Sequence, residues 1–92
     1  MGTGMTVHIA LTIHGSETET LEALQNRGLK AAVVEPSLRT RDNPASQRTE
    51  TQCTVTGDTV EQSVENWFQE SWTAQHSGTD RPGALLNYTY RP

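Results

Sequence analysis

Apolar and polar residues alternate over residues 6–14, and this period of two predicts a strand with one buried face and one solvated face. A weaker alternation over residues 48–56 predicts a further strand, and its low hydrophobicity favours a position at a sheet edge. A short apolar run at residues 31–35, ended by Pro36, predicts the second strand along the chain. The last strand is expected at residues 84–90, with one face made by Ala84, Leu86, Tyr88 and Tyr90.

Two other stretches have the spacing of amphipathic helices. Ser16 is followed three residues later by Glu19, which predicts a capping box at the start of the first helix. Gly28 suits the left-handed position just after the end of that helix. The second helix is expected to be capped by Asp58 or Thr59, and its apolar stripe is formed by Val60, Val64, Trp67, Phe68 and Trp72.

The order of these elements is β-α-β-β-α-β. It predicts an α+β fold with a single antiparallel sheet and two helices on one face, the ferredoxin-like arrangement, in which the other sheet face is polar and open. We expect residues 1–92 to form a single domain, with residues 1–5 as a flexible leader and residues 36–47 as a long loop without periodicity. This fold hosts many unrelated functions and implies none of them.

Composition makes some classes of function less favoured. The net charge of -4 and the pI near 5.2 disfavour nonspecific binding of nucleic acid or an anionic membrane by the whole surface. No stretch approaches the ~20 apolar residues of a spanning helix, so we expect no membrane partner. A single cysteine, Cys53, cannot form an internal disulfide, which fits a reducing cytosol.

The sequence carries no catalytic signature. It contains no glycine-rich phosphate loop, nucleophile elbow or metal-ligand pair. His8 and His14 share a strand face but lie ~20 Å apart, too far to hold one metal by themselves. Cys53 has the periodicity of an inward position and is interpreted as a structural thiol. We therefore expect no enzyme activity, no cofactor, no metal and no small-molecule substrate.

Arginines supply the strongest functional candidate. Arg39, Arg41 and Arg48 offer planar, bidentate donors to phosphates or carboxylates, with Arg27 and Lys30 as weaker supports. Two alternatives stay open: the arginines could be solubilising charge, and the acidic helices could imitate nucleic-acid phosphates. Tyr88 and Tyr90 share a strand face, where they either pack in the core or form an exposed aromatic platform.

One segment resembles a known family. Residues 53–66, CTVTGDTVEQSVEN, are similar to the strand–Gly-Asp-Thr–helix segment of HicB-type antitoxins, which is about a seventh of the chain. That family usually has an Asp-Leu-Pro-Gly turn just before this strand, where this chain has RTET at residues 48–51. The resemblance implies an antitoxin that neutralises a small toxin by binding it.

The chain as a whole resembles a second group. Its opening TVHIALTIHG at residues 6–15, its size and its acidity look like a phage anti-CRISPR protein that inhibits type I-F systems. This resemblance implies a non-enzymatic, stoichiometric inhibitor in the host bacterial cytosol. Its expected partner is a multisubunit Cas surveillance complex, with direct contact to the crRNA backbone, and its expected effect is a block of target DNA recognition.

Overall fold

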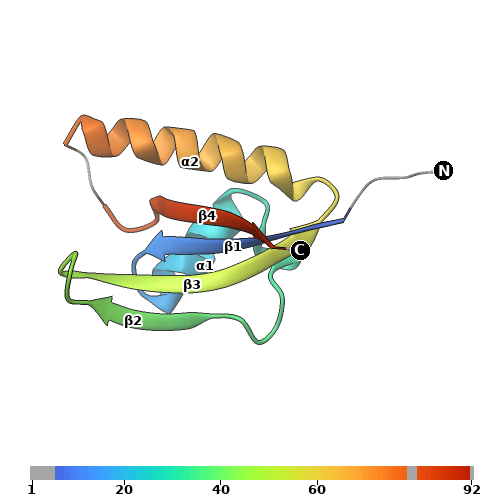
Figure 1. The fold of residues 1–92 in the computed structure, drawn as a ribbon, viewed down its shortest axis with the longest axis horizontal. Helices are drawn as coiled ribbons and strands as arrows, with labels where there is room; N and C mark the ends of the chain where they lie inside the picture. Colours follow the sequence, from blue (N-terminus) through green and yellow to red (C-terminus); the bar gives the residue numbers. More distant parts are fainter. Residues whose placement is uncertain (1–5, 79–80, 92) are drawn as a thin grey trace.

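The computed structural model describes residues 6–78 and 81–91, so the expected leader at residues 1–5 lies outside the described residues. The elements follow one another in the predicted order, with one short 3-10 helix added (Figure 1). They are β1 (Val7–His14), α1 (Glu17–Asn26), η1 (Lys30–Ala32), β2 (Arg39–Asn43), β3 (Arg48–Gly57), α2 (Val60–His76) and β4 (Leu85–Arg91).

The four strands form one antiparallel sheet in the order β2-β3-β1-β4. The two helices lie on one face of it, which confirms the predicted ferredoxin-like fold. In Figure 1, α1 lies behind the sheet and α2 runs along its β4 edge. The prediction that β3 is an edge strand is wrong, because β3 lies between β2 and β1 and its inward residues Thr51, Cys53 and Val55 are buried.

The second strand and the long loop were expected in the wrong places. Residues 30–32 form the 3-10 helix, and only Val33 makes an isolated bridge, to Val55. The predicted loop at residues 36–47 instead contains β2, which pairs along its whole length with β3. β2 gave no hydrophobic signal because it is an edge strand, held by backbone hydrogen bonds and carrying mostly charged side chains.

The ends of α1 follow the sequence closely. The Ser16 hydroxyl accepts a hydrogen bond from the Glu19 amide at 3.3 Å, and the Glu19 carboxylate accepts one from the Ser16 amide at 2.9 Å. Gly28 has φ +70°, and the Leu29 amide donates to the Leu24 carbonyl at 2.8 Å. This is the Schellman pattern that the sequence predicts.

The start of α2 differs from that of α1. Thr59 is the N-cap, as one of the two candidates, but its side chain makes no capping hydrogen bond. Its backbone has ψ 4°, whereas the Ser16 N-cap is extended with ψ 175°. An extended N-cap directs its side-chain oxygen toward the first free amides of the helix, and Thr59 lacks that conformation.

The core lies between the sheet and the helices. The periods of the strands and helices predict nine core residues, of which six are buried together: Ile9, Leu11, Ile13, Leu24, Val60 and Val64. The other three, Val7, Leu21 and Phe68, are only partly buried and pack against this cluster. The predicted face of the last strand is corrected by an irregularity between Thr12 and Ile13, where the pairing register with β4 shifts. Leu85 consequently pairs with Ile13 and takes the core position expected for Leu86.

Candidate functional site

The β2–β3 hairpin brings Arg39, Arg41 and Arg48 to the face of the sheet away from the helices, here called the open face. In the register of the hairpin, Arg39 pairs with Gln52, Arg41 with Glu50 and Asn43 with Arg48. Paired residues share a face, and that face is opposite to the one carrying buried Thr51. The three predicted arginines, here called the arginine hairpin, therefore lie together, on strands rather than in a loop.

One carboxylate lies within the arginine hairpin. Glu50 is only 6% exposed and accepts hydrogen bonds from the Asn43 amide at 3.2 Å and the Ser46 hydroxyl at 3.3 Å. The Arg41 guanidinium lies 3.8 Å from its Oε1, while the Arg41 side chain remains 60% exposed. The guanidinium thus lies near a buried carboxylate without a hydrogen bond to it, and most of its surface is in solvent.

A fourth arginine reaches the open face from the other sheet edge. Arg91 on β4 pairs with His8 on β1, whose side chain shares the face of the arginine hairpin. A shallow depression of about 820 Å³ lies between Arg39 and Arg91. Its floor is polar and includes Thr12, Gln52, Asn87 and Thr89. Four of the seven Lys and Arg residues of the chain thus lie on the open face.

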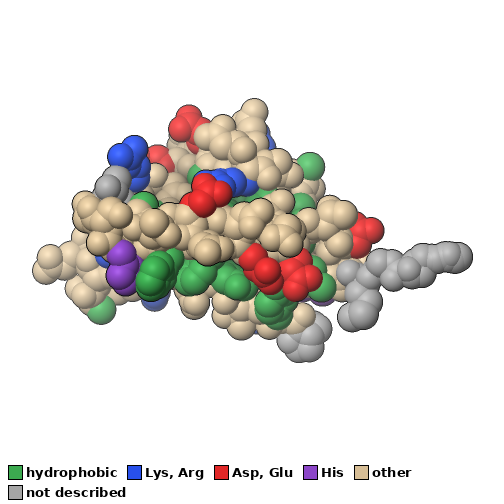
Figure 2. Space-filling model, turned by 90° about the horizontal axis from the view of Figure 1, so that it is seen from above, with side chains coloured by type: hydrophobic (Ala, Val, Ile, Leu, Met, Phe, Trp, Pro, Cys, Tyr) green, Lys and Arg blue, Asp and Glu red, His purple; other side chains and the backbone are tan. Residues whose placement is uncertain are grey.

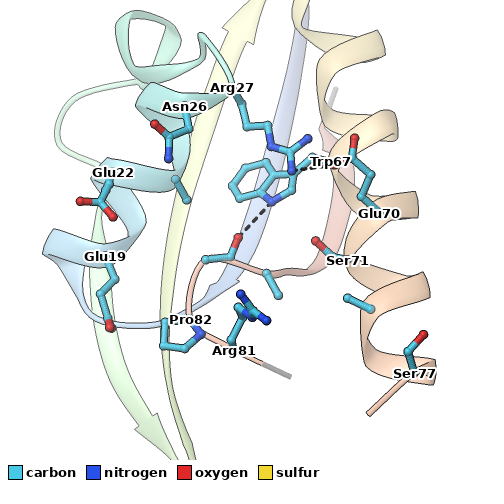
Figure 3. A pocket seen from close by; sticks show the side chains of 14 residues that line it. Glu19, Glu22, Asn26, Arg27, Trp67, Glu70, Ser71, Ser77, Arg81 and Pro82 are labelled. Atoms are coloured by element: carbon cyan, nitrogen blue, oxygen red, sulfur yellow. Dashed lines mark hydrogen bonds and ion pairs between the residues drawn. The ribbon is translucent and has the colours of Figure 1, made fainter. Parts of the chain in front are cut away.

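The two weaker candidates lie elsewhere. Arg27 caps the end of α1 on the helix side of the sheet, and its guanidinium forms an ion pair with Glu70 at 2.9 Å (Figure 3). Its Cζ also lies 5.9 Å from the centre of the Trp67 ring. Lys30 begins η1 and is exposed. The structure therefore does not bring Arg27 and Lys30 together with the arginine hairpin.

A groove of about 730 Å³ separates α1 from α2 (Figure 3). Trp67 lies at its floor, and the indole N–H donates to the Gly83 carbonyl at 3.0 Å. Acidic side chains of both helices line it, and the Arg27 guanidinium holds the pKa of Glu70 below its ordinary value through a hydrogen bond and its charge. We interpret these contacts as structural, because they join α1 to α2.

A second exposed surface was only partly expected from the sequence. Trp72 is 51% exposed and stacks on His76 with the ring centres 3.7 Å apart. Phe68 meets the edge of Tyr88 at 5.1 Å, and Tyr88 meets Tyr90 at 5.9 Å. Figure 2 shows the hydrophobic side chains in a row, with a histidine at one end and acidic side chains toward the other. We call this row along α2 and β4, made by Phe68, Trp72, His76, Tyr88 and Tyr90, the aromatic stripe.

The stripe decides between the two interpretations of the tyrosines. Tyr88 and Tyr90 pair with Leu11 and Ile9, so they lie on the helix side and do not form a platform on the open face. The Tyr90 hydroxyl donates to Glu61 at 2.9 Å and to Glu65 at 2.7 Å. Desolvation of the hydroxyl, followed by these hydrogen bonds and charges, raises the pKa of Tyr90 above its ordinary value. The sequence signal for the stripe was the spacing of Trp72 and His76, four residues apart on one helix.

Groups with catalytic potential are few. Cys53 is 3% exposed, and burial raises the pKa of its thiol to about 11, so the nucleophilic thiolate is disfavoured. Among residues 6–78 and 81–91, no three His, Cys, Asp or Glu side chains gather in a way that could hold a metal ion. The absence of catalysis stays a prediction.

Comparison of the chain with protein-family models, curated proteins and solved structures finds no match. The two resemblances therefore stay predictions. In the part of the chain that the structure describes, neither helix is both long enough and apolar enough to cross a bilayer.

Proposed function

We propose that this protein is a non-enzymatic inhibitor that binds a type I-F crRNA-guided surveillance complex and blocks its recognition of target DNA. The observation that carries the proposal is the gathering of the arginine hairpin and Arg91 on one open sheet face. Guanidinium groups match phosphate geometry bidentately, and the crRNA backbone supplies phosphates. The choice of a type I-F complex comes from the resemblance of the chain to that group of inhibitors.

Local charge outweighs net charge in this proposal. At physiological ionic strength, exposed charges farther apart than ~8 Å are largely screened from one another. A phosphate on the open face therefore interacts mainly with the nearby arginines and much less with the acidic helices on the other side of the sheet. If the three hairpin arginines each neutralise one phosphate of single-stranded RNA, the logarithm of the binding constant should fall with the logarithm of salt concentration with a slope of about −2.

Inhibition by binding has a distinct titration curve. A purified type I-F complex, loaded with crRNA and held well above its dissociation constant for the protein, is titrated with the protein, and the complex still able to bind DNA is measured with excess target DNA. We expect DNA binding to fall linearly and to stop falling at a fixed molar ratio. Loss of DNA binding at substoichiometric amounts, or no loss at any ratio, would rule the proposal out. The site of action would be the bacterial cytosol, where the lone thiol of Cys53 stays reduced.

An antitoxin function is the second candidate. The observation that favours it is that residues 53–66, which resemble HicB-type antitoxins, form a strand, a turn and the start of a helix. The acidic helices would then face a small basic toxin. Under this alternative the protein would leave the surveillance complex unaffected and would restore growth to cells that express the toxin encoded beside it.

A further inference from the structure

The aromatic stripe contains a small pocket that the proposed function does not use. It has a volume of about 340 Å³, and its walls are the rings of Phe68, Trp72 and Tyr88, with Glu65 and Gln69 beside them. Aromatic faces carry partial negative charge and attract a cation placed over them. The Glu65 carboxylate adds a full negative charge at the same place. This combination suits the side chain of an arginine or lysine, which has an apolar stem and a cationic end.

The pocket lies beside the β4 edge of the sheet. Within the described residues, β4 pairs with β1 alone and so has no second strand partner. The helix α2 reaches this edge at its start, where the Leu85 amide donates to the Ser71 hydroxyl at 2.9 Å. The other sheet edge, β2, is short and carries charged residues in the sequence RTRDN. β4 has the sequence LLNYTYR, with its one charge at the end. Charged residues discourage strand addition, so β4 is the edge at which a further strand would pair more readily.

We propose that the β4 edge binds an extended segment of a protein partner and that the pocket receives an arginine or lysine side chain of that segment. Backbone hydrogen bonds to β4 would supply affinity, and the pocket would supply specificity, as in other cases of strand addition. Glu61 lies beside Glu65, since the Tyr90 hydroxyl donates to both, so a second cationic residue of the segment is also favoured. This inference stands apart from the open face and would hold with either candidate function.

Charge favours this occupant over the alternatives. An uncharged apolar segment would cover the aromatic rings but would bring no counter-charge to Glu61 and Glu65. A second copy of the chain would bring its own acidic α2, and its β4 has one cation, Arg91. A cationic partner segment instead has a charge at each position where the stripe has a carboxylate.

A pair of peptides tests the pocket. The probe is a seven-residue, strand-forming peptide of alternating threonine and valine with a central arginine, and its control has neutral citrulline at that position. Binding is followed by NMR chemical shifts of the indole N–H groups, because Trp72 lines the pocket whereas Trp67 is buried. We expect the arginine peptide to shift the Trp72 signal and to bind about threefold to tenfold more tightly than the citrulline peptide. Equal binding of the two peptides, or no binding, would overturn the proposal.

Matched variants locate the contact. Trp72→Ala and Glu65→Gln should each weaken binding of the arginine peptide by about threefold or more. Both variants should fold, because Trp72 is half exposed and glutamine keeps an acceptor for Tyr90. Thr73→Ala is the control, since Thr73 is exposed on the same helix but does not line the pocket. Equal losses in all three variants would overturn the assignment. Sedimentation of the parent protein over a range of concentrations tests whether a second copy of the chain occupies the β4 edge. A dimer that Trp72→Ala dissociates would overturn the proposal in favour of self-association.

Discussion

The two sides of the sheet carry charges of opposite sign. The open face carries four arginines, and Glu50, the only acidic residue on this face among the described strand residues, is buried. The helices on the other side carry six glutamates at residues 17, 19, 22, 61, 65 and 70. A net charge of -4 therefore averages over two surfaces of opposite sign. Whole-chain charge therefore disfavours nonspecific binding by the entire surface but says little about one face.

The arginines on the two sides also differ in how closely they contact other side chains. Arg27 donates to Glu70 at 2.9 Å and lies over the Trp67 ring, so its guanidinium already has partners within the helical layer. Arg41 lies 3.8 Å from Glu50, beyond hydrogen-bond distance, and points a largely exposed side chain outward. The same residue type thus makes close contacts within the helical layer at Arg27 and remains largely exposed at Arg41.

The largest expected effect separates the two tryptophans of α2. Trp67 is 1% exposed and Trp72 is 51% exposed, although both were expected in one apolar stripe. Trp67→Ala should lower the free energy of unfolding by about 3–5 kcal/mol, because it empties a packed site and removes the donor to the Gly83 carbonyl. Trp72→Ala should cost less than about 1 kcal/mol. Denaturant unfolding of both variants measures the difference, and equal losses would contradict the division between core and stripe.

The next effect concerns the core at alkaline pH. Burial raises the pKa of Cys53 from 9.0 to about 11, so folding favours the neutral thiol. The stability that this shift contributes is present below pH 9 and is lost as the pH rises from 9 to 11, up to about 2–3 kcal/mol. The Cys53→Ala variant should lose less stability than the parent between these pH values. Parallel stability curves for the two proteins would contradict the burial of the thiol.

The smallest effect concerns the open face itself. Glu50→Gln removes a negative charge from beneath the arginine hairpin while keeping an acceptor for Asn43 and Ser46. A unit charge ~4 Å away contributes about 1 kcal/mol in water, so binding to the surveillance complex should tighten by about fivefold. The matched control is Glu70→Gln on the helix side, which should leave binding unchanged. Weaker binding by Glu50→Gln at an unchanged melting temperature would show that the carboxylate, rather than the arginines, serves the contact.

The sequence correctly predicted the elements that depend on a strong local pattern. The alternation in β1, the capping box at Ser16 and the left-handed Gly28 each depend on neighbours in the chain, and each is confirmed. β2 escaped prediction because an edge strand is stabilised by its partner and needs no hydrophobic period. The apolar residues 31–35 were mistaken for a strand, since a short apolar run fits several structures equally well.

The candidate site was predictable in its residues but not in its geometry. Arg39, Arg41 and Arg48 were singled out as a cluster, and the hairpin register brings them to one face. Arg27 was included because it is cationic, and only the fold shows that it belongs to the helix side. The contribution of Arg91 and the aromatic stripe depends on where β4 pairs, which is a contact between distant parts of the chain.

The central claim, that the arginine hairpin contacts the crRNA-guided complex, is tested most directly by two charge variants in one inhibition assay. Arg39→Ala, Arg41→Ala and Arg48→Ala are combined in the first, and Arg27→Ala with Lys30→Ala in the second. Each desolvated charged contact contributes ~1.5–3 kcal/mol, so the triple variant should inhibit at least about tenfold less well with its fold intact, while the double variant should stay within about threefold of the parent. A triple variant that inhibits as well as the parent at limiting concentration would contradict the claim and would move the contact to the acidic helices.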